Sequence, residues 1–136
     1  MSAEILHLDH IGVSVSDLER SLAFYRDLLG MPELERTTTS SGTTLVFLRM
    51  GDAGLVELIY RPGNELSRQK AAGPRVGHAC LHVNSMDAWL EKLAAHQISL
   101  TSGPSEITLP SGKVRLCFFA DPDGIPVELY ERMHEV

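Results

Sequence analysis

The chain carries an internal repeat, and a repeat of this length predicts two copies of one structural unit. When His10 is set against His78, the segment DHIGVSVSDLERSLAFYRDLLGM aligns with GHACLHVNSMDAWLEKLAAHQI. When Glu57 is set against Glu128, LVFLRMGDAGLVELIY aligns with LCFFADPDGIPVELYE. The histidine and the glutamate are 47 residues apart in the first copy and 50 in the second. We therefore predict two similar modules within a single domain spanning residues 1–136.

Each copy has the pattern of a strand, a helix and then further strands. Ile11, Val13 and Val15 alternate with small residues, which is the period of a half-buried strand. The pair Ser16-Asp17 can cap a helix, and Gly30 is a natural stop for it. Further strands are predicted at residues 44–50, 76–84 and 114–120. The predicted helix of each copy has an apolar stripe at helical spacing, formed by Leu18, Leu22, Tyr25, Leu28 and Leu29 in the first copy and by Met86, Trp89, Leu90 and Leu93 in the second.

The segment between the copies has the composition of a linker. It contains Pro62, Gly63, Gly73 and Pro74, and a short helix at residues 65–72 is compatible with its sequence. The predicted boundaries are residues 5–61 for the first module, 62–75 for the linker and 76–132 for the second module.

Strand alternation places four potential metal ligands on equivalent faces. His10 lies opposite the apolar face of its strand, and His78 does the same in the second copy. Glu57 and Glu128 likewise oppose the apolar residues of the two closing strands. If helices cover the apolar faces and the two sheets curl towards each other, all four side chains point into one cleft. Two carboxylates and two imidazoles suit a divalent cation, and they leave room for two substrate oxygens or waters.

The bulk properties exclude several other classes of protein. A net charge of -6 provides no surplus of Lys and Arg to neutralise the phosphates of a nucleic acid. No apolar run approaches the roughly 20 residues that span a bilayer, and the start of the chain lacks a secretory signal. The two cysteines, Cys80 and Cys117, form neither a CxxC pair nor a disulfide framework. We expect a cytoplasmic protein with reduced thiols and no membrane or nucleic-acid partner.

The opening DHIGVSVSDLERSLAFYRDLLGM, the segment GHACLHV and the closing DPDGIPVELYE resemble the vicinal oxygen chelate superfamily, which includes glyoxalases, bleomycin resistance proteins and ring-cleaving dioxygenases. The likeness runs from about His7 to Glu131. It implies an α+β fold in which two βαβββ modules form a curved mixed sheet around a metal-binding cleft, with helices on the outer face. It also implies one divalent metal ion (Zn, Ni, Co, Mn or Fe) held by His10, Glu57, His78 and Glu128, and a homodimer.

Within the family, the full set of four ligands favours a glyoxalase-like lyase or isomerase. Such an enzyme acts on a small substrate with vicinal oxygens through a metal-stabilised enediolate, and Glu128 or Glu57 would be the general base. Ser14, His82 and Arg115 are candidate substrate contacts, Arg115 only if its strand face points inward. The alternatives are an extradiol-type dioxygenase, for which Glu57 would be superfluous, and a non-catalytic binding or resistance protein.

The sequence also departs from typical glyoxalase I. That family usually has an Arg where this chain has Ser14, and an Asn where it has Arg61, so we do not expect glutathione to be recognised in the familiar way. The closing motif does not favour a methylmalonyl-CoA epimerase. The substrate, the metal, and whether the site closes within one chain or across a dimer are not determined by the sequence.

Overall fold

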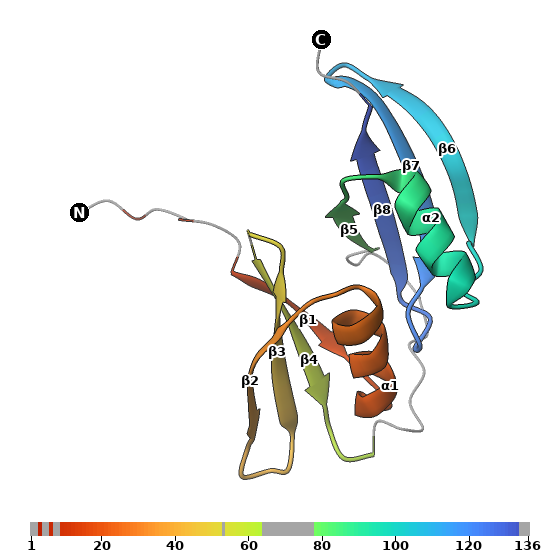
Figure 1. Ribbon diagram of the computed structural model, residues 1–136. Helices are drawn as coiled ribbons and strands as arrows, with labels where there is room; N and C mark the ends of the chain where they lie inside the picture. The colour runs from red at the N-terminus through yellow and green to blue at the C-terminus, as the bar shows by residue number, and fades with distance from the viewer. Residues whose placement is uncertain (1–2, 4–5, 7–8, 53, 64–77, 134–136) are drawn as a thin grey trace. The chain divides into compact units, whose positions relative to one another are not determined.

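The computed structural model describes residues 3, 6, 9–52, 54–63 and 78–133 (Figure 1). The chain divides into two compact units, residues 1–68 and residues 69–136. The predicted linker helix at residues 65–72 lies outside the described residues.

The first unit is a four-stranded sheet with one helical segment. Its strand order is β1-β4-β3-β2, with β1 parallel to β4 and the other neighbours antiparallel. The parallel pair arises because the helical segment connects β1 to the remaining strands. In chain order the elements are β1 (His10–Ser14), α1 (Leu18–Leu22), η1 (Ala23–Leu28), β2 (Glu33–Thr38), β3 (Thr44–Met50) and β4 (Gly54–Tyr60).

The second unit repeats this topology. Its strand order is β5-β8-β7-β6, with β5 parallel to β8 and the other neighbours antiparallel. The elements are β5 (Ala79–His82), α2 (Met86–Ala95), β6 (Ser102–Leu109), β7 (Gly112–Ala120) and β8 (Pro126–Arg132). The predicted α+β fold with two βαβββ modules is therefore confirmed. Of the strand predicted at residues 76–84, β5 covers residues 79–82, and residues 78, 83 and 84 are not part of it. Residues 76–77 lie outside the described residues.

The helix predicted from the stripe beginning at Leu18 exists, but its second half is wound more loosely than expected. The side chain of Asp17 caps its start by accepting a hydrogen bond from the backbone N–H of Arg20 at 3.1 Å. From Ala23 onwards the segment is a π-helix, whose wider turn is visible in the bond from Leu29 N–H to the carbonyl of Phe24 at 2.9 Å. No helix among the described residues is long and apolar enough to cross a membrane.

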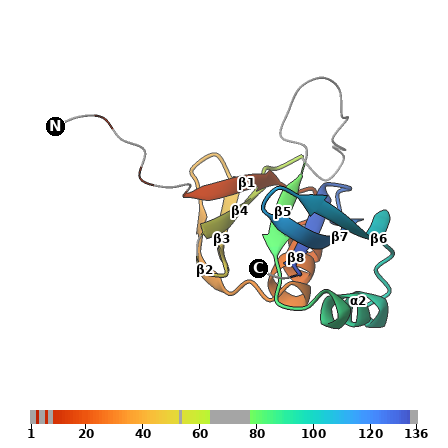
Figure 2. The same cartoon turned by 90° about the horizontal axis from the view of Figure 1, so that it is seen from above.

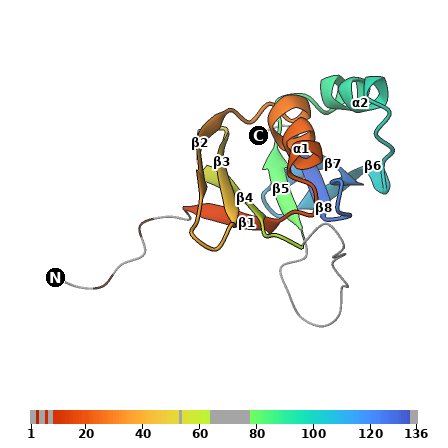
Figure 3. The same cartoon turned by 90° about the horizontal axis from the view of Figure 1, so that it is seen from below.

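In each unit one face of the sheet carries the core. The helical segments lie against β4 in the first unit and β8 in the second, and Figures 2 and 3 show α2 on one side of its own sheet. The register aligns the buried residues on that face, as with Val46 opposite Leu58 and Cys117 opposite Leu129. Because side chains alternate along a strand, Glu57 and Glu128 lie on the other face, away from the core.

Candidate metal centre

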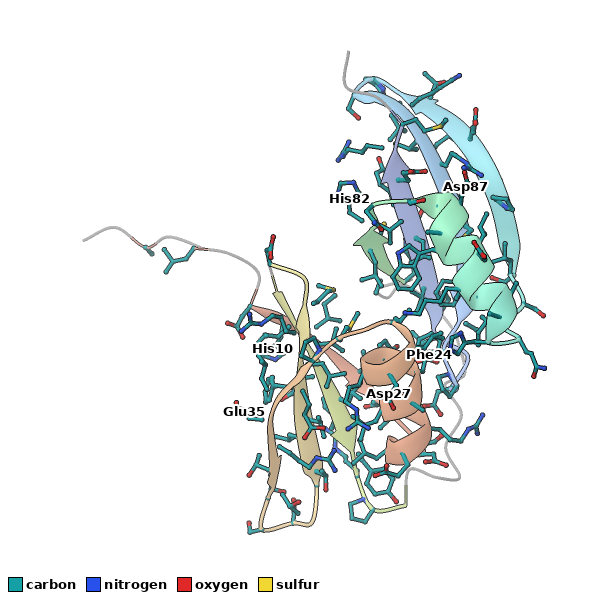
Figure 4. The ribbon with its side chains drawn as sticks, in the orientation of Figure 1. His10, Phe24, Asp27, Glu35, His82 and Asp87 are labelled. Atoms are coloured by element: carbon teal, nitrogen blue, oxygen red, sulfur yellow. The ribbon has the colours of Figure 1, made fainter. Side chains whose placement is uncertain are left out.

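In the first unit His10 and Glu57 form a pair on the face opposite the core. Parallel pairing of β1 with β4 sets Gly12 beside Glu57, with His10 two residues before Gly12. The distance from Nε2 of His10 to Oε1 of Glu57 is 3.8 Å, and the Glu57 side chain is only 14% exposed. The imidazole also packs edge-on against Phe47 with the ring centroids 5.6 Å apart. Figure 4 shows His10 beside the strands of this unit.

The His10 ring is oriented by Asp9, a residue that no pattern in the sequence marks as functional. Nδ1 of His10 donates to Oδ2 of Asp9 at 2.8 Å, because an ionised carboxylate can only accept. In the neutral ring this leaves a lone pair on Nε2, facing the carboxylate of Glu57. Nε2 of His10 and Oε1 of Glu57 thus face each other across 3.8 Å as two acceptors, and both are of the type that could hold a divalent cation.

The second unit contains the equivalent pair. Nε2 of His78 and Oε1 of Glu128 are 2.9 Å apart, and the Glu128 side chain is 12% exposed. Phe118 packs edge-on against His78 with the centroids 5.2 Å apart, as Phe47 does against His10. The predicted association of one histidine with one glutamate thus recurs on the same face of both sheets. Here Nε2 donates to the carboxylate, so a cation bound at this pair would replace that proton.

These residues fit a divalent cation by their chemistry. Two largely buried carboxylates are costly in an apolar setting unless a positive charge or hydrogen-bond donors compensate them. Each one faces an imidazole nitrogen, which is a strong ligand for transition metals. Among residues 9–52, 54–63 and 78–133, no single cluster brings together three or more His, Cys, Asp or Glu side chains that could hold a metal ion. Within each unit, the described residues of the pair therefore offer two donors, one imidazole nitrogen and one carboxylate.

Two ionisable groups beside these pairs have shifted pKa values. The hydrogen bond to Asp9, followed by the charge of Glu57, raises the pKa of His10 above its usual 6.5. Partial burial of the sulfur raises the pKa of Cys80 to about 12, helped by the nearby charge of Glu128. Since cation ligands must be unprotonated, the first shift means that protons compete with a cation at His10.

Arg115 lies on the helix-bearing face of its sheet, whereas the predicted substrate contact requires the opposite face, which bears Glu128. Its guanidinium donates to Asp87, in the first turn of α2, at 2.9 Å. The register sets Arg115 opposite Glu131, with the parity of the core residues Cys117 and Leu129. The condition of an inward strand face is not met, so Arg115 is not part of the proposed site.

Ser14 and His82 both lie on the ligand-bearing faces. The hydroxyl of Ser14 accepts a hydrogen bond from the guanidinium of Arg61 at 3.4 Å, so the two positions that differ from typical glyoxalase I are in contact. His82 is exposed and packs edge-on towards Tyr130 with the centroids 6.4 Å apart. Their contact with a substrate stays a prediction.

The fold and these pairs can be set beside known proteins. The family model of the Glyoxalase/Bleomycin resistance protein/Dioxygenase superfamily matches residues 7–129, which is nearly the whole chain. The chain belongs to this superfamily. The resemblance read from the opening and closing motifs is therefore confirmed.

Three relatives illustrate the range of this superfamily. A lactoylglutathione lyase from Salmonella typhimurium is 32% identical over 133 residues, covering 93% of each chain. The mitochondrial methylmalonyl-CoA epimerase of Mus musculus is 30% identical over 129 residues, covering 90% of this chain and 71% of that protein. The trypanothione-dependent glyoxalase I of Leishmania major superposes with a TM-score of 0.76 at 28% identity, covering 92% of this chain and 86% of that one.

The identities to a lyase and to an epimerase are nearly equal. Overall similarity therefore does not separate the two activities. The closing motif alone is not a sufficient reason to set an epimerase aside.

Proposed function

We propose that this chain is a metal-dependent lyase or isomerase that acts on a small substrate with two neighbouring oxygens. His10, Glu57, His78 and Glu128 together hold one divalent cation, and one of the two glutamates moves a proton on the substrate. The observation that carries the proposal is the duplicated pair: in each unit an imidazole nitrogen faces a largely buried carboxylate of the neighbouring strand.

The residues around the proposed site have separate roles in the reaction. The chemistry that a divalent cation supplies when bound is Lewis-acid stabilisation of negative charge on the substrate oxygens. Asp9 holds the His10 ring so that Nε2 presents its lone pair. Phe47 and Phe118 pack against the two imidazoles and limit their rotation. A glutamate in this position removes a proton from the carbon beside the substrate carbonyl and returns it to the substrate.

The relatives agree with this class of reaction. A lyase and an epimerase stand at almost the same identity to the chain, and both are members of the enzyme classes that the proposal names. We favour this function over a ring-cleaving dioxygenase because a site with two histidines and one carboxylate would leave the second buried glutamate without a role.

Cation binding is the first test. Metal-stripped protein is titrated with Ni²⁺, Co²⁺, Zn²⁺ and Mn²⁺ by calorimetry, and we expect one ion per complete set of two pairs. His10→Ala and His78→Ala should each weaken binding at least tenfold. The matched control is His96→Ala, which removes an exposed histidine at the end of α2 whose Nδ1 contacts the carbonyl of Lys92. The same loss in all three variants, or no stoichiometric binding by the wild type, would refute the proposal.

Whether the pairs meet within one chain or between two chains can be decided by complementation. One variant carries His10→Ala and Glu57→Gln, and the other carries His78→Ala and Glu128→Gln. If two chains share the site, the mixture regains a quarter to a half of the wild-type binding capacity, whereas each variant alone binds nothing. If the site closes within one chain, the mixture binds no better than its components.

Proton transfer is the second test. The metal-loaded protein is incubated in deuterated water with methylmalonyl-CoA, with the methylglyoxal–glutathione adduct and with small 2-oxo and 2-hydroxy acids. Incorporation of deuterium at the carbon beside the carbonyl, seen by NMR, supports the proposal. Glu57→Gln and Glu128→Gln are compared with Glu35→Gln, which changes an exposed glutamate of β2. Oxygen consumption with a catechol, without any deuterium incorporation, would favour the dioxygenase instead.

A further inference from the structure

Both copies of the repeat carry an arginine four residues after the glutamate of the proposed site. Aligning Glu57 with Glu128 sets Arg61 against Arg132. Arg61 directly follows β4, Arg132 ends β8, and both are exposed. Because side chains alternate along a strand, each arginine lies on the same sheet face as its glutamate. The chain has a net charge of -6, so a cation at the same place in both copies is a local exception to its acidic character.

In the first unit, the Arg61 side chain is turned back along the strand towards Glu57. Nη1 of Arg61 donates a hydrogen bond to the hydroxyl of Ser14 at 3.4 Å. The parallel register sets Ser14 beside Ile59, two residues before Arg61 on the way to Glu57. The guanidinium therefore reaches the level of Ile59. Two residues of strand, or about 7 Å, separate that level from Glu57.

In the second unit, Arg132 is turned in the same direction by an aromatic ring. Cζ of Arg132 lies 5.4 Å from the centroid of the Tyr130 ring, which is within the range of a cation–π contact. Tyr130 is two residues nearer to Glu128, and its ring packs edge-on against His82. A hydroxyl in one unit and an aromatic ring in the other thus give the two guanidinium groups comparable positions relative to their glutamates.

Neither of these contacts neutralises the charge of the guanidinium. Other arginines of the chain are paired with carboxylates at 2.8–3.1 Å, namely Arg26, Arg36 and Arg115. Within residues 9–52, 54–63 and 78–133, no carboxylate lies within 4.0 Å of the guanidinium of Arg61 or Arg132. A guanidinium has five N–H donors, and Ser14 accepts from one of them. The remaining donors match the two oxygens of a carboxylate or phosphate.

We propose that Arg61 and Arg132 are specificity residues that bind an anionic group of the substrate, a carboxylate or a phosphate, several covalent bonds away from its two reacting oxygens. This inference rests on the proposed function and deepens it by naming the substrate class, an elongated organic anion. The length follows from the strand spacing of about 7 Å between each glutamate and the level of the guanidinium. The carboxylate of a short 2-oxo acid is one of the reacting oxygens' own groups, so it does not reach the arginines.

Hydroxamic acids that resemble such a substrate provide the test. A hydroxamate binds a divalent cation through two neighbouring oxygens and is not turned over. Two series with tails of increasing length, one ending in a carboxylate and the other in a methyl group, are titrated by calorimetry into the Ni²⁺-loaded protein. Once the tail reaches the arginines, we expect the carboxylate series to bind at least about tenfold more tightly. This preference should be absent for the shortest tails and should weaken at high salt, because salt screens exposed charges.

The arginines are then replaced by glutamine, singly and together. Arg61→Gln and Arg132→Gln should each lower the preference for the carboxylate series, and the double variant should remove it. Binding of the methyl series should not change, since neither guanidinium contacts a methyl-ended tail through its charge. The matched control is Arg20→Gln, which removes the same charge from an exposed position of α1. A preference that survives in the double variant, or an equal loss of affinity in both series, would overturn the proposal.

The contacts that orient the two guanidinium groups are tested in the same assay. Ser14→Ala removes the acceptor that holds Arg61, and Tyr130→Leu removes the ring beneath Arg132. Each should lower the preference about threefold, which is the size expected for one exposed contact of this kind. Tyr130→Phe keeps the ring and should behave as the wild type does. A leucine variant that matches the phenylalanine variant would show that the ring does not position Arg132.

Failure of this inference and failure of the proposed function give different results. If the wild type binds no divalent cation, the proposed function is wrong, and the substrate class named here is wrong with it. If the wild type binds Ni²⁺ but binds both hydroxamate series equally at every tail length, only the anion specificity is wrong. A preference that disappears in the double variant, with unchanged Ni²⁺ affinity, supports both.

Discussion

Replacement of Asp121 by alanine should destabilise the second unit, because this carboxylate organises the turn that leads into β8. The residue is 5% exposed, and its Oδ1 accepts hydrogen bonds from the backbone N–H of Asp123 at 2.9 Å and of Ile125 at 2.8 Å. Its own backbone N–H donates to the carbonyl of Ile125 at 2.9 Å. The turn that results sets the register at which Glu128 enters the sheet.

The expected magnitude follows from the two bonds to one charged oxygen. A hydrogen bond to a charged group contributes about 1.5–3 kcal/mol, and two bonds that share an acceptor add less than twice that amount. We therefore expect Asp121→Ala to lower the free energy of unfolding by about 3 kcal/mol, or the melting temperature by about 10 °C. Asp121→Asn keeps an acceptor oxygen but loses the charge, so it should cost only about 1 kcal/mol.

The assay is urea unfolding followed by the fluorescence of Trp89, which is the single tryptophan and lies on α2 of the same unit. Asp52→Ala is the control, because Asp52 is an exposed aspartate in the turn between β3 and β4. We expect that variant to stay within about 0.5 kcal/mol of the wild type. The reasoning is refuted if Asp121→Ala also stays within that range, or if the asparagine variant is as unstable as the alanine variant.

Three further predictions concern titratable groups. Asp9→Asn should lower the pKa of His10 towards 6.5 in NMR titrations of the metal-free protein, since the bond to Asp9 is the main cause of the raised value; an unchanged pKa would contradict this. Hydrogen bonds from Arg36 and Arg26 lower the pKa of Glu33, so its ionised form stabilises the fold. Glu33→Gln should therefore lower the free energy of unfolding by about 1 kcal/mol or less above pH 5, and this difference should disappear as the pH falls through the range in which the carboxyl group becomes protonated. Thermal melts of both proteins at pH 7 and pH 3 measure the difference. With a pKa of about 12, the rate at which Cys80 reacts with iodoacetamide should rise with pH up to about pH 11. A rate that stops rising near pH 9 would contradict that pKa.

The repeat and the strand alternation were enough to predict the fold and the sheet face on which one histidine and one glutamate of each unit lie. Aligning His10 with His78 gives the order of elements twice, and a period of two puts each glutamate on the face opposite the core. Both inferences use only local geometry and the need to bury apolar residues. They do not depend on which strands are neighbours.

What the sequence could not provide is contact across strands. Cys80 lies beside Glu128 because β5 and β8 pair in one particular parallel register, and a shift by one residue would turn the thiol to the other face. The contact of Ser14 with Arg61 depends on β1 and β4 in the same way. The ion pair of Arg115 with Asp87 depends on where α2 packs. The π-helical turns after Ala23 have no signal in the apolar spacing, which fits an ordinary helix equally well.

Duplication by itself would produce two equal half-sites, and equal half-sites cannot give one carboxylate the role of ligand and the other that of base. The symmetry is broken at the histidines. Asp9 precedes His10 and accepts from its Nδ1 at 2.8 Å, so Nε2 of His10 keeps its lone pair. Among the described residues, His78 is instead bonded through Nε2 to Glu128 at 2.9 Å. Under the proposed function, the first unit therefore contributes an imidazole that is already oriented for a cation. This difference predicts that Asp9→Asn weakens cation binding, because it removes the partner that orients the ring.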